Sequence, residues 1–187
     1  MPTKMSLATV LLALLTSASP ALAGMRLISA GLVEGDTLPS DQVMSGFGCS
    51  GADLSPALAW QDPPAGTKSF VLTAYDPDAP TGSGLWHWSV VNLPAATTEL
   101  PEGAGAAGSK SLPIGTIQAR NDFSRNAYTG ACPPAGAEAH RYVFTVYALP
   151  VAELPLDETT SAAIVGFYAN TSALDRASLT VTYSRPE

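Results

Sequence analysis

The motif Asp76-Pro77-Asp78-Ala79-Pro80 decides how this chain folds, because it ends an apolar run with the length of a buried strand. The run, residues 70–75, reads Phe-Val-Leu-Thr-Ala-Tyr and is too short for a typical helix. Both prolines of the motif lack the N–H that a sheet requires, so the strand ends here. On an extended backbone Asp76 and Asp78 project to the same side. The sequence therefore predicts two carboxylates at one strand end.

The next strand along the chain, expected over residues 86–92, begins with a histidine between two tryptophans. Strict alternation along this strand would give two opposite faces. One face would carry His87, Ser89 and Val91, and the other Trp86, Trp88 and Val90.

The second histidine stands at the opening of another strand, expected over residues 142–149. It belongs to the cluster His140-Arg141-Tyr142, in which His140 and Tyr142 lie on the same side of an extended backbone. The chain contains only two histidines, and both stand beside polar neighbours at strand openings. We therefore interpret them, together with the two aspartates, as parts of one site.

Residues 1–23 have the pattern of a signal peptide. Lys4 gives a positive start, residues 7–15 are apolar, and Ala21-Leu22-Ala23 fits a signal peptidase site. The alternative, a membrane anchor, is disfavoured because this apolar run is too short to span a bilayer. We expect cleavage after Ala23 and a single domain over residues 24–187 in the periplasm or outside the cell, with no stable membrane insertion.

The exported domain is acidic. The whole chain has a formal net charge of −7, and loss of the one lysine in the leader makes it −8. A negative, lysine-poor surface repels polyanions, so nucleic acid is excluded as an expected partner.

Export also bears on Cys49 and Cys132, the only two cysteines. An even pair in an oxidising compartment predicts a disulfide. It would tie the Gly46-Phe47-Gly48 loop to the loop that enters His140. Unpaired buried thiols and a redox couple are the alternatives, although neither cysteine belongs to a Cys-x-x-Cys motif.

The rest of the chain predicts a mainly β fold. Short strands are expected over residues 25–29, 57–61 and 178–183, and a helical pattern appears only near Thr159 to Leu174, where Gly166 should weaken it. We expect a sandwich with one or two short helices.

The predicted site residues allow four interpretations. Protonated imidazoles and the Tyr142 hydroxyl would bind a phosphate or carboxylate group. Two aspartates and two histidines would also suit a divalent metal. Ser89 near His87 would serve a hydrolase, although no Gly-x-Ser-x-Gly motif is present. A purely structural ion-pair network is the fourth.

The sequence resembles the phosphatidylethanolamine-binding protein family, also called Raf kinase inhibitor-like proteins, and in particular its bacterial branch. The resemblance rests on a series of short motifs in a fixed order: Phe47-Gly48-Cys49, Ser55-Pro56-Ala57-Leu58, residues 63–69, Asp76-Pro77-Asp78-Ala79-Pro80, Trp86-His87-Trp88, Val91-Asn92, Asn121-Asp122-Phe123, Cys132-Pro133-Pro134 and His140-Arg141-Tyr142.

This resemblance implies a β-sandwich of antiparallel sheets with a small pocket for an anionic group, such as a phosphoethanolamine or phospholipid head group. The matching positions that would line the pocket are Asp76, Asp78, His87, Pro134, His140 and Tyr142. The resemblance implies no cofactor, no metal and no established catalytic cycle. A protein partner, or a second copy of the chain in a homodimer, is compatible with it.

Two features depart from the family pattern. Glu138 stands where the family often has glycine, and this added carboxylate would either weaken anion binding or bulge the loop. The sequence ends at Glu187, shortly after the last expected strand, so we expect no C-terminal helix over the pocket and a more open mouth than in animal members.

Overall fold

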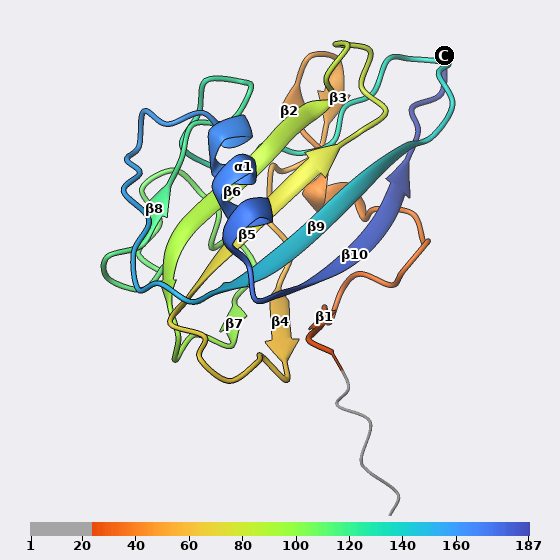
Figure 1. Cartoon of the computed structure of the whole chain (residues 1–187). Coiled ribbons are helices and arrows are strands. Elements are labelled where there is room, and N and C mark those ends of the chain that lie inside the picture. The colour runs from red at the N-terminus through yellow and green to blue at the C-terminus, as the bar shows by residue number, and fades with distance from the viewer. Residues whose placement is uncertain (1–23) are drawn as a thin grey trace, which may run out of the picture.

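A computed structural model describes residues 24–187, and the predicted signal peptide lies outside these residues. The fold is built on two antiparallel sheets packed face to face (Figure 1). The larger sheet has five strands in this spatial order: β10 (Asp175–Tyr183), β9 (His140–Leu149), β5 (Ser69–Asp76), β6 (Leu85–Pro94) and β8 (Ile117–Gln118).

The smaller sheet has three short strands and covers one face of the larger one. Its order is β1 (Arg26–Ile28), β4 (Leu58–Gln61) and β7 (Glu99–Leu100). A separate hairpin consists of β2 (Ser45–Gly46) and β3 (Cys49–Ser50), preceded by a 3-10 helix over Ser40–Gln42. The structure thus confirms the expected mainly β sandwich of antiparallel sheets.

The main core lies between the two sheets. Strand β5 supplies it with Phe70, Leu72 and Ala74 at alternate positions, which fits a strand covered on both faces. Trp60 from the small sheet packs edge-to-face against Phe70, with ring centroids 5.3 Å apart. Burial of such aromatic side chains contributes roughly 1.5–3 kcal/mol each, so the sheets are held together mainly by these contacts.

The outer face of the five-stranded sheet carries a second, smaller core under helix α1 (Ala162–Ser172). Gly166 lies in this helix, and a Cβ there would stand 2.8 Å from the Trp86 ring. Glycine at position 166 lowers the helix propensity, but it also lets α1 approach Trp86 closely.

Strand β6 contains an irregularity that corrects the predicted alternation. In the pairing with β5, Trp88 is opposite Ala74 and Trp86 is opposite Tyr75, so His87 has no partner residue and forms a β-bulge. Trp88 consequently points into the main core, whereas Trp86 contacts α1 on the outer face. The prediction that both tryptophans share one face is wrong.

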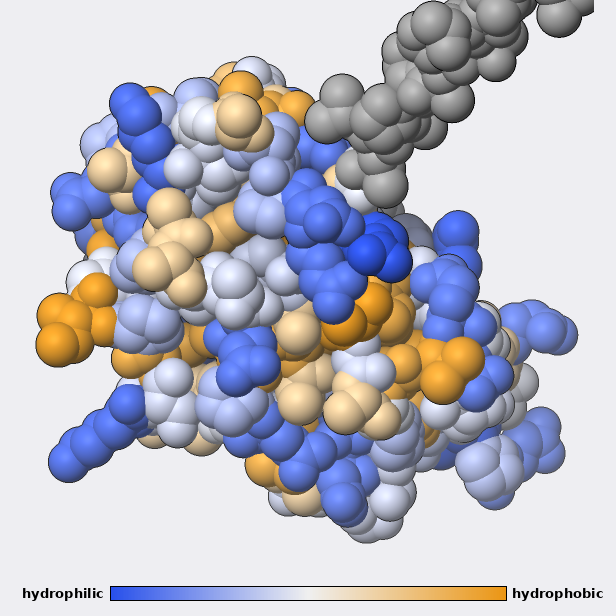
Figure 2. Space-filling model, turned by 90° about the horizontal axis from the view of Figure 1, so that it is seen from below, coloured by the Kyte–Doolittle hydropathy of each residue, from blue (hydrophilic) through white to orange (hydrophobic). Residues whose placement is uncertain are grey.

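The described residues contain no helix that is long and apolar enough to cross a membrane. Figure 2 shows the end of the molecule opposite the β2–β3 hairpin of Figure 1, where apolar patches are interrupted by hydrophilic side chains.

Candidate functional site

The end of β5 carries a buried carboxylate on the core side of the sheet. Asp76 is 2% exposed, and its Oδ2 accepts a hydrogen bond from His140 Nδ1 at 2.8 Å. Its Oδ1 accepts the N–H groups of Asp78 and Ala79 at 2.8 and 3.0 Å, in the turn where the prolines end the strand. The turn that ends β5 thus fixes one oxygen of this carboxylate, and the other oxygen holds His140.

Asp78 is oriented quite differently from Asp76, towards Arg141 and not towards an imidazole. Its carboxylate accepts the Nε and Nη2 hydrogens of Arg141 at 2.8 and 2.7 Å, and the Arg141 backbone N–H at 2.9 Å. This fork lies at the surface, with the Asp78 side chain 30% exposed. Hydrogen bonding to Arg141 lowers the pKa of Asp78 to about 2. The two carboxylates thus leave one strand end but serve different partners.

The β-bulge turns His87 towards Tyr142 of β9, and the two ring centroids are 5.3 Å apart. His87 is buried, and its Nδ1 lies 2.8 Å from the carbonyl oxygen of Thr129. Because a carbonyl only accepts, Nδ1 carries the hydrogen, and in the neutral ring Nε2 is left with a lone pair. Nε2 is buried without a hydrogen-bond partner among the described residues.

Burial determines the protonation of this part of the site. It lowers the pKa of His87 below its ordinary value, so the ring is neutral near pH 7. Burial, followed by the negative charge of Asp76, raises the pKa of Tyr142, so the phenol keeps its proton. The site therefore combines a phenol donor, a neutral imidazole acceptor and an imidazole paired with a carboxylate.

Phenylalanine rings connect His87 to the surface. Phe123 packs against His87 with a centroid separation of 5.3 Å, and Phe47 packs edge-to-face against Phe123 at 6.3 Å. Phe47 is 78% exposed, at the tip of the β2–β3 hairpin. One wall of the candidate site is therefore apolar.

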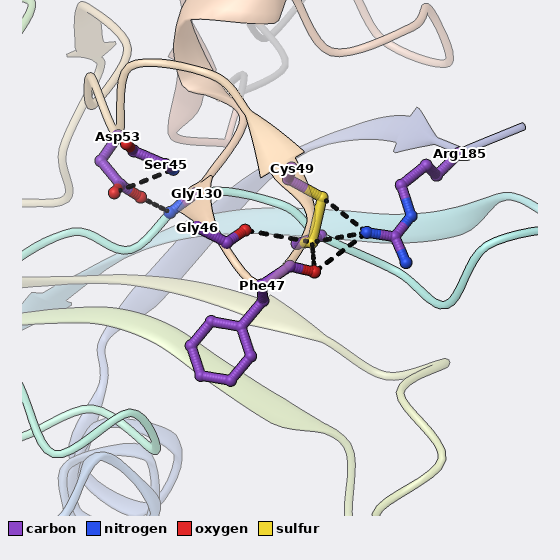
Figure 3. Close-up of a disulfide and its surroundings, with 8 residues drawn as sticks. Ser45, Gly46, Phe47, Cys49, Asp53, Gly130 and Arg185 are labelled. Carbon is purple, nitrogen blue, oxygen red and sulfur yellow. Dashed lines mark hydrogen bonds between the residues drawn. A yellow bond between two sulfur atoms is a disulfide. The ribbon is translucent and has the colours of Figure 1, made fainter.

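The predicted disulfide between Cys49 and Cys132 is present, and Figure 3 shows its surroundings. It joins the β2–β3 hairpin to the loop before β9, as the sequence predicts. Arg185 donates from Nη1 to the Phe47 carbonyl oxygen at 3.0 Å and lies 3.4 Å from the sulfur of Cys49. The covalent link and this hydrogen bond together fix the hairpin tip, where Phe47 has a φ of 53°.

A buried amide that the sequence did not single out for the site also positions His87. Asn121 donates from Nδ2 to the carbonyl oxygens of His87 and Ala127 and to Thr129 Oγ1, at 2.9–3.1 Å. Its Oδ1 accepts two backbone N–H groups of the following turn. Asn121 thereby ties the bulge of β6 to the segment that supplies the Thr129 carbonyl. The motif Asn121-Asp122-Phe123 was the available signal.

Comparison with known proteins agrees with this architecture. The profile of the family described as phosphatidylethanolamine-binding protein matches residues 29–184. The chain belongs to this family. The UPF0098 protein YbhB of Escherichia coli is 54% identical over 160 residues, which cover 86% of this chain and 100% of that protein. The crystal structure of E. coli YbcL superposes with a TM-score of 0.85 at 46% identity, covering 87% of this chain and 99% of YbcL.

A more distant relative of this chain is named a putative lipoprotein, LppC of Mycobacterium tuberculosis. It is 36% identical over 141 residues, which cover 75% of this chain and 63% of LppC.

Two residues singled out with the family's pocket in mind lie at the surface of this family member. Pro134 is exposed in the loop before β9, and its carbonyl oxygen accepts the N–H of Ala137 at 3.3 Å. Glu138 is also exposed, two residues before His140. A role for Pro134 in lining the pocket stays a prediction, as does weakening of anion binding by Glu138.

The geometry bears on the hydrolase and metal alternatives for this chain. Ser89 is opposite Thr73 in the β5–β6 pairing, and the Ser89 hydroxyl makes no hydrogen bond to His87 or to any other group among the described residues. The sequence-based pairing of Ser89 with His87 as nucleophile and base is therefore wrong. Within residues 24–187 no three His, Cys, Asp or Glu side chains converge as metal ligands would.

Proposed function

We propose that this protein is a binding module for a small phosphate or carboxylate group, held between His87, His140 and Tyr142. The observation that carries the proposal is the buried pair of His140 and Asp76, with the 2.8 Å hydrogen bond between them. A carboxylate that fixes Nδ1 of an imidazole leaves Nε2 as a directed hydrogen-bonding group for a ligand. Tyr142, which keeps its proton, is the second donor.

His87 makes the proposed binding proton-dependent. In the free protein its ring is neutral, because burial lowers its pKa, and Nε2 offers a lone pair. An oxyanion beside a lone pair is repelled, unless a proton is placed between them. The ligand group therefore arrives as the monoprotonated phosphate, or His87 takes up a proton as the ligand binds. At pH values above the second pKa of the phosphate, where the free group is a dianion, both routes take up a proton from solution.

Titration calorimetry with phosphoethanolamine tests this proposal. Affinity should be higher at pH 6 than at pH 8, because the phosphate and the imidazole both titrate in this range. Repeating the titration in buffers with different ionisation enthalpies should show net proton uptake. Equal affinity at the two pH values, or binding that strengthens as pH rises, would contradict the proposal.

Tyr142→Phe is the sharpest variant, because it removes one buried hydroxyl and keeps the ring that packs against His87. Loss of a hydrogen bond to a charged ligand should weaken binding by about tenfold or more. Tyr168→Phe on helix α1 removes the same atom remote from His87 and is the matched control. Equal affinities of the two variants would argue against Tyr142 as a donor.

A second candidate function is inhibition of, or docking to, a protein that presents an acidic or phosphorylated side chain. The exposed ring of Phe47, held rigidly at the rim of the site, favours it. A rigid exposed aromatic is typical of an interface anchor. Phe47→Ala should abolish capture of such a partner but leave phosphoethanolamine affinity within about twofold, since the free head group lacks the apolar contact.

We also infer that the protein acts in the periplasm or outside the cell. The leader pattern of residues 1–23, the disulfide and the lipoprotein name of LppC support this inference. Mass spectrometry of the protein secreted by its native host should find Gly24 at the N-terminus. An intact Met1 on a cytoplasmic product would contradict it.

A further inference from the structure

A groove crosses the outer face of the five-stranded sheet, on the side opposite the main core. In Figure 1 helix α1 lies over β6 and β5 and leaves the adjacent parts of β9 and β10 uncovered. The groove beside the helix has a volume of about 480 Å³, within the range of small-ligand sites. Its lining includes Tyr75, Trp86, Thr145, Asn170, Arg176 and Ser178.

One wall of this outer groove contains two aromatic rings that are packed against each other. The rings of Tyr75 and Trp86 lie 4.4 Å apart, and both side chains are half-buried. The hydroxyl of Tyr75 donates to the carbonyl oxygen of Ser83 at 2.7 Å, and Trp86 is backed by Gly166 of α1. Because these contacts already restrict both rings, the two side chains lose little additional conformational entropy when a ligand packs against them.

The opposite wall consists of hydrogen-bonding side chains that are already oriented. Arg176 donates from Nη1 to Asn170 Oδ1 at 2.8 Å, which fixes the plane of the guanidinium. Thr145 and Ser178 share a hydrogen bond of 2.9 Å between their hydroxyls. Both walls belong to packed strands and the helix, so polar donors and acceptors face an aromatic surface across a preformed space.

The chemistry of the lining narrows the class of ligand. None of the described residues that line the groove is acidic, which disfavours a cation as ligand. Arg176 is the one charged residue of this lining, and a single positive charge is insufficient to bind a polyphosphate. Strands β5 and β9 are paired on both sides, so an added peptide strand finds no free backbone groups there.

We propose that this outer groove binds a neutral sugar ring, whose apolar C–H face packs against the exposed part of the Tyr75–Trp86 pair while its hydroxyls bond to Arg176, Asn170 and Ser178. A sugar has both an apolar face and a rim of hydroxyl groups, which matches the two walls. The groove lies on the other face of the sheet from His140, so the two sites bind independently.

NMR titration of the purified protein with cellobiose, maltose and N,N′-diacetylchitobiose tests the proposal. The chain has three tryptophans, of which Trp60 and Trp88 are fully buried in the main core. One of the three disaccharides should shift the indole N–H signal of Trp86 in a saturable way and leave the other two indole signals in place. Prior addition of phosphoethanolamine should not change this response.

Two variants separate binding from folding. Tyr75→Ala should abolish the shift, and Arg176→Gln, which changes an exposed side chain, should weaken binding by about tenfold. The control is Phe167→Ala, which removes an exposed aromatic ring of helix α1 that does not line the groove. This variant should leave the affinity unchanged. The proposal is overturned if none of the disaccharides gives a saturable shift, if both groove variants bind normally, or if 5′-AMP shifts the Trp86 signal while the sugars do not.

Discussion

Two carboxylates, Asp76 at the end of β5 and Asp78 in the turn that follows, pair with neighbouring residues of β9, yet the two pairs differ in burial and in hydrogen bonding. Asp76 and His140 have side chains that are 3% and 8% exposed, and they form one hydrogen bond in the interior. Asp78 and Arg141 are 30% and 57% exposed and are joined by a side-chain fork with an added backbone bond. The better hydrogen-bonded pair is the one that water surrounds.

This difference shows that burial, more than the number of hydrogen bonds, decides what each pair does. A surface pair gains little, because water solvates both ions when they separate. A buried carboxylate that loses its partner keeps the full cost of desolvation. Neighbouring residues of a strand point to opposite sides, so His140 enters the site and Arg141 leaves it.

The largest effect should come from His140→Ala, which leaves the Asp76 carboxylate buried with no imidazole beside it. We expect a loss of about 3–5 kcal/mol in the free energy of unfolding, measured by urea denaturation. Arg141→Ala, in the matched position of the surface pair, should destabilise the protein far less, because water solvates both charged groups when they separate. If the two variants were equally destabilised, burial would not be the property that separates the pairs.

Acid should affect the buried region first. His87 has a lowered pKa in the folded protein, so the unfolded chain binds a proton more readily, and stability should fall as pH drops below about 6.5. His87→Gln should flatten this part of the stability curve relative to the unmodified protein. Denaturation midpoints between pH 7.5 and pH 5, where unperturbed carboxylates remain ionised, measure the difference. A variant with the same slope as the unmodified protein would show that His87 is not the group responsible.

The smallest effect should come from the surface pair and appear only in strong acid. The pKa of Asp78 is about 2 in the folded protein against an ordinary value of 3.8, so its stabilisation is present above 3.8 and is lost as pH falls towards 2. Asp78→Asn should cost no more than about 1 kcal/mol at pH 7. Thermal unfolding at neutral pH should therefore barely distinguish this variant, and a loss as large as that of His140→Ala would refute the surface assignment.

Local pattern was enough to predict the sandwich, its long strands and the Cys49–Cys132 link, since alternation, turn residues and cysteine count are local or compositional signals. Strand alternation also predicted that His140 and Tyr142 lie on the same side of one strand, and both lie on the core side. The prediction failed where strict alternation stopped. Pairing between strands creates the bulge at His87, and no short window of sequence contains both partners.

The roles of Asp78 and Asn121 also could not be predicted from a short window of sequence. The spacing of Asp76 and Asp78 predicted two carboxylates on the same side of one strand end, but after the turn that follows β5 the second carboxylate bonds to Arg141, from a distant segment. The role of Asn121 depends on three acceptors brought together by tertiary structure. Such roles follow from contacts across the fold, which a sequence pattern does not state.

The bulge in β6 also means that His87 takes no part in the residue pairing between β6 and β5. Without His87, Trp86 and Trp88 would be adjacent in an ordinary strand and would still point to opposite faces, opposite the same residues of β5. The histidine is thus an insertion that leaves the register on either side intact. Deletion of this one residue would therefore remove the buried imidazole, while the strand would keep its pairing on both sides and its contacts with the two cores between which it runs.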